Sequence, residues 1–137
     1  GAKLLEAADS AGVRVGCAPD TMLGGGMQTC RKVIDDGWIG EPVAATFFVS
    51  YHGYEHWHPN VEDFYREGTG PMYDLGPYYV AALLTLLGPA RRVSGLSRKT
   101  FEQRVITSEA RFGELVDVRT PTHITGVIEL ASGAIAT

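Results

Sequence analysis

Apolar positions near the start of the chain follow the period of a helix and then that of a strand. Residues 2–11 carry leucine and alanine at helical spacing and end at Gly12, a helix stop. Residues 13–17, VRVGC, form a short apolar run typical of a buried strand. A helix followed directly by such a strand is typical of the tail of an α/β unit. A second helical face then ends at Gly37; its apolar members are Met27, Cys30, Val33 and Ile34.

Strict alternation of apolar and polar positions predicts two longer strands. Residues 43–51 alternate cleanly, which predicts a strand covered on one face and partly exposed on the other. Residues 122–130 alternate in the same way, and Ser132-Gly133 predicts a tight hairpin into residues 134–137. A further strand is predicted around Val93 within residues 91–100, and a short strand at 115–118. Residues 101–114 are predicted to be irregular.

The longest apolar run lies within residues 68–88, GTGPMYDLGPYYVAALLTLLG. A helix that is apolar all round is normally buried, and the following Gly88-Pro89 is a strong stop signal. The pattern therefore predicts a buried central helix with Pro77 in its first turn, where a missing N–H costs nothing. Asp74 is predicted at or near its N-cap, where a carboxylate accepts backbone N–H bonds.

Asp74 and Tyr78 are the candidate chemical groups of this helix. If the backbone is helical between them, their spacing of four residues places a carboxylate and a phenol on one face. The structural alternative is a plain N-cap beside a core tyrosine. Gly68, Gly70 and Gly76 favour the functional alternative, since glycines leave the backbone around Asp74 open to a ligand.

Residues 52–67, HGYEHWHPNVEDFYRE, follow neither period, yet they are too aromatic for a disordered segment. The stretch holds His52, His56 and His58 together with Trp57, Phe64 and Tyr65. A metal-dependent hydrolase or lyase using these histidines and Asp74 is one interpretation. The stretch lacks a regular helix and an obvious carboxylate ligand. We therefore expect no metal, but a loop packed over the start of the central helix that offers hydrogen bonds and a stacking surface to a polyol.

Length, composition and charge limit the classes of function. A chain of 137 residues with 45% apolar residues can bury a real core. With 12 basic and 16 acidic residues the net charge is −4, without a basic stripe, so we expect neither nucleic acid nor an anionic membrane as a partner. No apolar run approaches a membrane span, and the N-terminus has no signal-peptide pattern.

The cysteines and the glycine triplet are interpreted as structural features. Cys17 and Cys30 have neither the number nor the spacing of a disulfide framework or a zinc site, so we predict reduced, buried thiols in a cytoplasmic protein. The triplet Gly24 to Gly26 lacks the third glycine of a dinucleotide fingerprint, because Thr29 takes its place. We therefore predict a flexible joint within a loop rather than a phosphate cradle.

Three stretches carry a resemblance to a known family. Residues 12–48, the sequence EHWHPN at 55–60, and residues 68–95 resemble the Gfo/Idh/MocA oxidoreductases, the group of glucose–fructose oxidoreductase and inositol dehydrogenase. The resemblance includes the family motif D-x-G-x-H/Y, from Asp74 to Tyr78. Many relatives have histidine at the last position, whereas members of the glucose–fructose oxidoreductase type have tyrosine.

The resemblance implies an α+β fold with an open, mostly antiparallel sheet and helices packed on one face. Residues 1–22 then match the last helix and strand of an N-terminal Rossmann domain, and residues 23–137 match a C-terminal substrate and oligomerisation domain truncated at its end. NAD or NADP would be bound mainly by the missing N-terminal domain. The family's Glu-Lys-Pro motif, whose lysine lies near the reacting hydroxyl, would also precede Gly1.

The implied reaction is hydride transfer between a sugar or polyol hydroxyl carbon and nicotinamide, which this chain would not perform alone. Tyr78 is the expected proton relay or substrate anchor, and Asp74 orients it. His56, His58 and Trp57 are the expected substrate contacts. The resemblance further implies a homo-oligomer formed through the open sheet face. The alternative is a non-catalytic ligand-binding or dimerisation module with the same open sheet.

Overall fold

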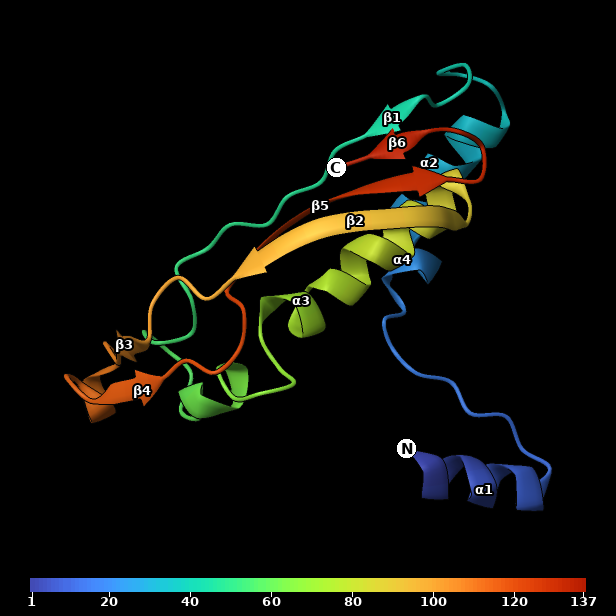
Figure 1. Cartoon of the computed structure of the whole chain (residues 1–137). Coiled ribbons are helices and arrows are strands. Elements are labelled where there is room, and N and C mark those ends of the chain that lie inside the picture. Colours follow the sequence, from blue (N-terminus) through green and yellow to red (C-terminus); the bar gives the residue numbers. More distant parts are fainter.

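The main body of the molecule is a four-stranded sheet with two helices on one of its faces (Figure 1). The computed structural model describes all residues, 1–137. The strands lie in the order β1 (Ala44–Ala45), β6 (Ile135–Ala136), β5 (His123–Leu130) and β2 (Ala90–Arg98). The helices are α2 (Gly25–Asp35) and α4 (Gly76–Leu87), preceded by the short helices η1 (Thr21–Leu23) and α3 (Pro71–Asp74). The predicted α+β class is confirmed.

Antiparallel pairing dominates the sheet, as expected. Strands β2 and β5 pair from Arg98 opposite His123 to Ala90 opposite Leu130, and β5 continues into β6 through the predicted hairpin. Gly133 makes this turn possible, because its φ of 91° is left-handed and its N–H donates to the carbonyl of Leu130 at 3.0 Å. Only β1 joins in parallel, beside β6.

Strand β1 is much shorter than the predicted strand over residues 43–51. Its backbone hydrogen bonds to the last strand extend only from Val43 to Phe47. The carbonyl of Val43 accepts the N–H of Ile135, and the N–H of Phe47 donates to the carbonyl of Thr137 at 2.9 Å. Residues 48–51 have no backbone partner. Alternation fixes which face a side chain takes, so Ala45 and Phe47 pack on the core as predicted, but a partner strand fixes the length of the pairing.

The core of the main body lies between α4 and the sheet. Four residues are buried there, with Ala45, Phe47, Leu87 and Ile128 packed at the edge; the four are Leu83, Leu130, Ala134 and Ala136. Leu83 is the only residue of α4 that is fully buried, and Leu84 on the next position is exposed. The prediction of a helix buried all round is therefore wrong for the structure of this chain, because the sheet covers only one side of it.

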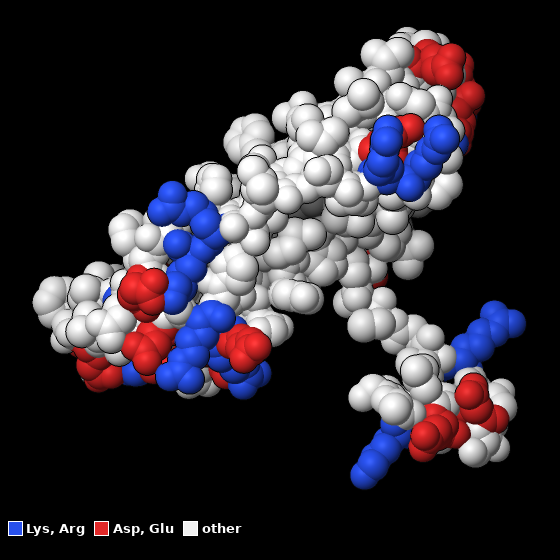
Figure 2. All heavy atoms as spheres, viewed as in Figure 1, with Lys and Arg blue, Asp and Glu red and all other residues white.

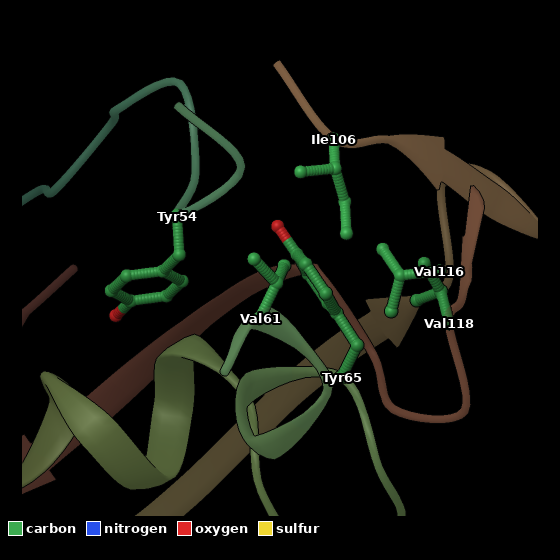
Figure 3. Close-up of a cluster of buried hydrophobic side chains, with 6 residues drawn as sticks. All are labelled: Tyr54, Val61, Tyr65, Ile106, Val116 and Val118. Atoms are coloured by element: carbon green, nitrogen blue, oxygen red, sulfur yellow. The ribbon is translucent and has the colours of Figure 1, made fainter. Parts of the chain in front are cut away.

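A smaller lobe, residues 52–67 with 101–119, sits beyond the ends of β2 and β5 (Figure 1). It contains the antiparallel pair β3 (Gln103–Val105) and β4 (Leu115–Asp117), with the 3-10 turns η2 (Val61–Phe64) and η3 (Glu109–Arg111). Figure 3 shows its own core, formed by Tyr54, Val61, Tyr65, Ile106, Val116 and Val118. Strand β4 confirms a prediction, whereas residues 101–114 are less irregular than expected since they include β3.

Helix α1 (Ala2–Ala11) is set apart from the main body (Figure 1). It ends as predicted at Gly12, whose φ of 64° is left-handed. The predicted strand at 13–17 is wrong: these residues are extended but pair with no other strand, and Val13 and Val15 are exposed. An apolar run becomes a strand only where another strand accepts its backbone hydrogen bonds.

Two further predictions are corrected by the structure. Cys17 and Cys30 are unpaired as expected, but both are exposed; residue 17 lies in the connection after α1, and residue 30 lies within α2. Gly24 precedes α2, whereas Gly25 and Gly26 already form its first turn rather than a loop. None of the helices has the length and apolar character needed to cross a membrane.

Candidate functional site

Asp74 lies where the main body meets the smaller lobe, at the end of α3. Its N–H donates to the carbonyl of Gly70 at 2.9 Å, so Asp74 closes a helical turn instead of capping the next helix. Leu75 takes the N-cap position of α4, without a side-chain hydrogen bond, and Pro77 lies in the first turn as predicted. Asp74 thus lies near the N-cap as predicted, one position before it, and only the predicted capping by its carboxylate is wrong. Its carboxylate is engaged elsewhere, since Oδ2 accepts a hydrogen bond from the hydroxyl of Tyr54.

Tyr78 lies one turn further along, in the first turn of α4, with a half-exposed side chain. Its N–H donates to the carbonyl of Leu75 at 3.1 Å, but its hydroxyl makes no hydrogen bond to Asp74. The adjacent Tyr79 instead faces the sheet and stacks on Phe47, with ring centroids 5.8 Å apart. Asp74 and Tyr78 thus lie one helical turn apart as predicted, but the carboxylate of Asp74 is hydrogen-bonded to the phenol of Tyr54 instead.

That partner, Tyr54, is the centre of an aromatic cluster. Its ring stacks on Phe64 with centroids 3.7 Å apart and meets the edge of Tyr51 at 5.4 Å. Burial, followed by the hydrogen bond to Asp74, raises the pKa of Tyr54 well above that of an ordinary phenol. The hydroxyl is therefore a proton-bearing donor to the carboxylate at any physiological pH.

The loop residues predicted to contact substrate surround this cluster. Trp57 is 59% exposed and meets His58 at 5.1 Å, and His58 meets Phe64 at 4.7 Å. His58 Nδ1 accepts the N–H of Asn60 at 3.0 Å, whereas His56 is exposed. The predicted packing of the loop against the start of the central helical region is confirmed, but through Tyr54, which the sequence analysis did not single out.

The histidines of this loop are not gathered into a metal-binding group. His52 and His56 approach each other with ring centroids 6.0 Å apart. No group of three or more His, Cys, Asp or Glu side chains with metal-binding geometry occurs in the chain, and Asp74 is directed to Tyr54.

The glycines around Asp74 make room for the protein's own atoms. Gly70 has a φ of 99°, and a Cβ there would lie 2.7 Å from Cγ2 of Thr120. A Cβ on Gly76 would lie 2.9 Å from the sulfur of Met72. The prediction that these two glycines leave space for a ligand is therefore wrong, whereas Gly68, with a φ of 80°, has open space beside it.

An ion pair between the buried Glu55 and the partly exposed Arg104 joins the loop to β3. Glu55 is 1% exposed; its Oε1 pairs with Arg104 and accepts the hydroxyl of Tyr65 at 2.7 Å. Burial, and then this bond to Glu55, raises the pKa of Tyr65. Sequence analysis missed Glu55 and Arg104, since nothing in the local pattern of either residue indicates the other. The one available signal was a charged residue inside a largely aromatic stretch.

A carboxylate with one bound and one unbound oxygen is the chemical feature of this site. Oδ2 of Asp74 is occupied by Tyr54, and Oδ1 accepts no hydrogen bond from the chain, so Oδ1 is the oxygen left to accept one from a hydroxyl. Tyr78 is a half-exposed phenol in the first turn of α4, and Trp57 is an exposed indole whose ring lies 6.2 Å from that of Tyr54. Each of these side chains can form a hydrogen bond with a hydroxylated small molecule, and a carboxylate or a phenol can exchange a proton with it.

Comparison with solved structures shows the same fold at low sequence identity. An NAD-binding oxidoreductase from Klebsiella pneumoniae is 24% identical, with a TM-score of 0.70 over 98% of this chain and 36% of its own. A super-repressor mutant of Gal80p from Saccharomyces cerevisiae is 17% identical, with a TM-score of 0.76 over 98% and 37%. Levoglucosan dehydrogenase in complex with NADH and L-sorbose is 17% identical, with a TM-score of 0.60 over 80% and 30%.

The chain thus spans about a third of the length of these solved structures. No curated protein matches it in sequence. The family comparison is specific: residues 27–137 match the model of the GFO/IDH/MocA C-terminal domain. This chain therefore belongs to the GFO/IDH/MocA C-terminal domain family, whose members are oxidoreductases.

Proposed function

We propose that this chain is the substrate-side part of an NAD(P)-dependent oxidoreductase that moves hydride between a sugar or polyol carbon and nicotinamide. The family match over residues 27–137 is the observation that carries the proposal. In this proposal, residues 1–22 are the tail of a Rossmann domain, and residues 23–137 are the substrate and oligomerisation domain. The separation of α1 from the main body in Figure 1 supports placing that helix outside the substrate domain.

Two observations support the proposed substrate class. Levoglucosan dehydrogenase, with the same fold, holds NADH and L-sorbose, a hydroxyl-rich compound. In this chain Trp57 offers an exposed aromatic face, which suits the apolar side of a sugar ring. His56 and His58 offer hydrogen bonds beside it. We propose these three residues as the substrate contacts.

Removing hydride from a carbinol carbon also requires the hydroxyl proton to leave, so the site needs a proton relay. Tyr78 is the proposed relay or hydroxyl anchor, and Asp74 orients the substrate through its unbound oxygen. An ordinary phenol has a pKa near 10, so the reaction calls for a nearby cation. We propose that a lysine of the preceding domain supplies it. The chain alone is then inactive.

NAD or NADP would supply the hydride acceptor when bound. The residues of this chain do not fit its phosphates, because Gly25 and Gly26 are helical and no strand leads into them. We therefore propose that the cofactor is bound mainly by the Rossmann domain. Both cysteines are unpaired, which agrees with the cytoplasm as the proposed compartment.

Replacing Tyr78 by Phe tests the proposal. We expect kcat of the full-length enzyme to fall by roughly 10²-fold or more, the range of general acid–base catalysis. Tyr73→Phe is the matched control, because Tyr73 is 72% exposed on α3 and makes no side-chain hydrogen bond. NAD(P)H absorbance with a panel of polyols measures turnover. Unchanged turnover in Tyr78→Phe would exclude this residue from the chemistry.

A second candidate function is a binding and assembly module, which the likeness to the repressor Gal80p favours. The register places Leu96, Val127 and Ile135 on the sheet face opposite α4, and all three are exposed. In the view of Figure 2, charged groups lie toward the two ends of the main body, and its middle is uncharged. The same face carries the Arg92–Glu129 ion pair near one end. A sheet face that is partly apolar, with its charges at the ends, suits contact with a second copy of the chain.

Assembly and catalysis are separable by measurement. Light scattering of the full-length protein gives its mass, and a strict monomer would contradict a homo-oligomer formed through this face. An oligomer that turns over no hydroxylated substrate with either cofactor would favour the binding module over the oxidoreductase.

A further inference from the structure

We propose that Arg104 and Glu55 are positioning residues for the site, because they fix the turn that presses Tyr54 against Asp74. The inference rests on the proposed function, in which Asp74 orients the substrate. It assigns a role to an ion pair that lies outside the D-x-G-x-Y motif and whose buried member, Glu55, directly precedes the expected substrate contacts.

Arg104 holds both ends of the turn that contains Tyr54. One of its terminal nitrogens donates to the carbonyl of His52 at 2.6 Å, and its Nε pairs with the carboxylate of Glu55. The main chain is fixed as well, since the carbonyl of Glu55 accepts the N–H groups of Thr107 and Ser108 at 3.0 and 2.9 Å. Both ends of residues 52–55 are thus bound to the segment 104–108.

The turn is built around the buried carboxylate. Gly53 has a φ of 113°, and a Cβ there would overlap the carboxylate of Glu55 and lie 2.8 Å from the hydroxyl of Tyr65. Oε2 of Glu55 is buried and has no hydrogen-bond partner. A buried charge of this kind is costly, and an apolar pair of similar volume often stabilises a fold as well or better. We therefore infer that the carboxylate of Glu55 serves to fix the shape of the turn rather than to stabilise the fold.

Tyr54 connects the fixed turn to Asp74. It lies between the two anchored residues of the turn, and stacking on Phe64 restricts its ring. Its hydroxyl crosses from the smaller lobe to α3 and donates to Oδ2 of Asp74. Because this bond occupies one carboxylate oxygen, it determines which oxygen remains for the substrate hydroxyl. Loosening the turn would therefore misplace Asp74 without removing any group from the site.

Kinetics of the full-length enzyme test the inference through Arg104→Gln, Tyr54→Phe and the double variant. Each single variant should lower kcat by roughly 10- to 100-fold, the cost of small misplacements, with a smaller change in KM. The double variant should be no slower than Tyr54→Phe alone, since both changes break the same contact. Arg104→Lys should restore part of kcat and replaces Arg104→Gln if that variant fails to fold. Multiplying effects in the double variant would overturn the positioning role.

The matched control is Arg119→Gln, since Arg119 is an exposed arginine of the same lobe, paired with Asp117 at 3.3 Å. It should leave kcat unchanged.

A readout independent of turnover uses protein labelled with ¹³Cζ-tyrosine. The Tyr54 signal, identified by its loss in Tyr54→Phe, should shift in Asp74→Asn and in Arg104→Gln but not in Arg119→Gln. A Tyr54 signal unmoved by Arg104→Gln would overturn the inference. If the signal moves as expected while the enzyme oxidises no polyol, the proposed function fails and the contact stands.

Discussion

The two regions of the molecule bury their residues in opposite ways. The smaller lobe encloses polar groups together with apolar ones, since Glu55 and Tyr65 are buried beside Val61 and Ile106. The main body buries only small and aliphatic residues, and β2 is exposed along its whole length. Specific polar contacts therefore stabilise the lobe, whereas the main body is stabilised by apolar packing on one face of its sheet.

This difference indicates where geometry is controlled. Directional contacts such as Glu55 with Arg104 allow one arrangement, because a buried charge without its partner is costly. Apolar packing of a half-covered helix tolerates small shifts. Asp74 lies at the boundary and takes its hydrogen bond from the lobe. The lobe therefore sets the precision of the site, and the main body provides its frame.

The largest loss of stability is expected when the buried Glu55 loses its cation. Arg104→Ala leaves the carboxylate of Glu55 buried without a cation, and we expect unfolding to become easier by about 3–5 kcal/mol. Arg92→Ala removes an exposed partner of Glu129 on the sheet and should cost at most about 1 kcal/mol. Urea unfolding of the chain measures both. Equal losses would show that the lobe is no more dependent on its ion pair than the sheet.

A smaller effect is expected from opening a cavity in the lobe. Ile106 is completely buried, so Ile106→Ala should lower the free energy of unfolding by about 2–5 kcal/mol. The neighbouring Val105 is half-exposed on β3, so Val105→Ala should cost less than about 1 kcal/mol. Thermal unfolding of the two variants gives the comparison, and a similar shift in Tm would mean that Ile106 is not part of a packed core.

The smallest effect concerns pH at the edge of the lobe. The hydrogen bond from Arg111 lowers the pKa of Glu62 from 4.5 to about 2. Because the folded pKa is the lower one, this stabilisation is present above pH 4.5 and is lost as the pH falls toward 2. Glu62 is exposed, so screening limits the effect to less than about 1 kcal/mol.

Arg111→Gln should remove that part of the pH dependence, as seen in unfolding curves collected at successive pH values. An unchanged slope between pH 4.5 and 2 would show that the pair does not act in solution.

Elements defined by local periods could be predicted from the sequence. Helix α1 ends at Gly12 and β5 turns at Gly133 because glycine permits left-handed backbone at those positions. Pairing and burial could not be predicted in the same way. Residues 13–17 have no partner strand, and Cys17 is exposed. Strand pairing and burial both depend on which other segments of the molecule lie nearby.

The sequence by itself determined the helices α1, α2 and α4, the strands β2, β5 and β6, and the motif from Asp74 to Tyr78 that marks the family. Only the tertiary structure decided that Asp74 pairs with Tyr54 and that Arg104 lies against Glu55. Periodicity is read within one turn or one strand, so it identifies elements and their faces. The partners of buried polar groups come from segments far apart in the sequence, and packing alone brings them within hydrogen-bonding distance.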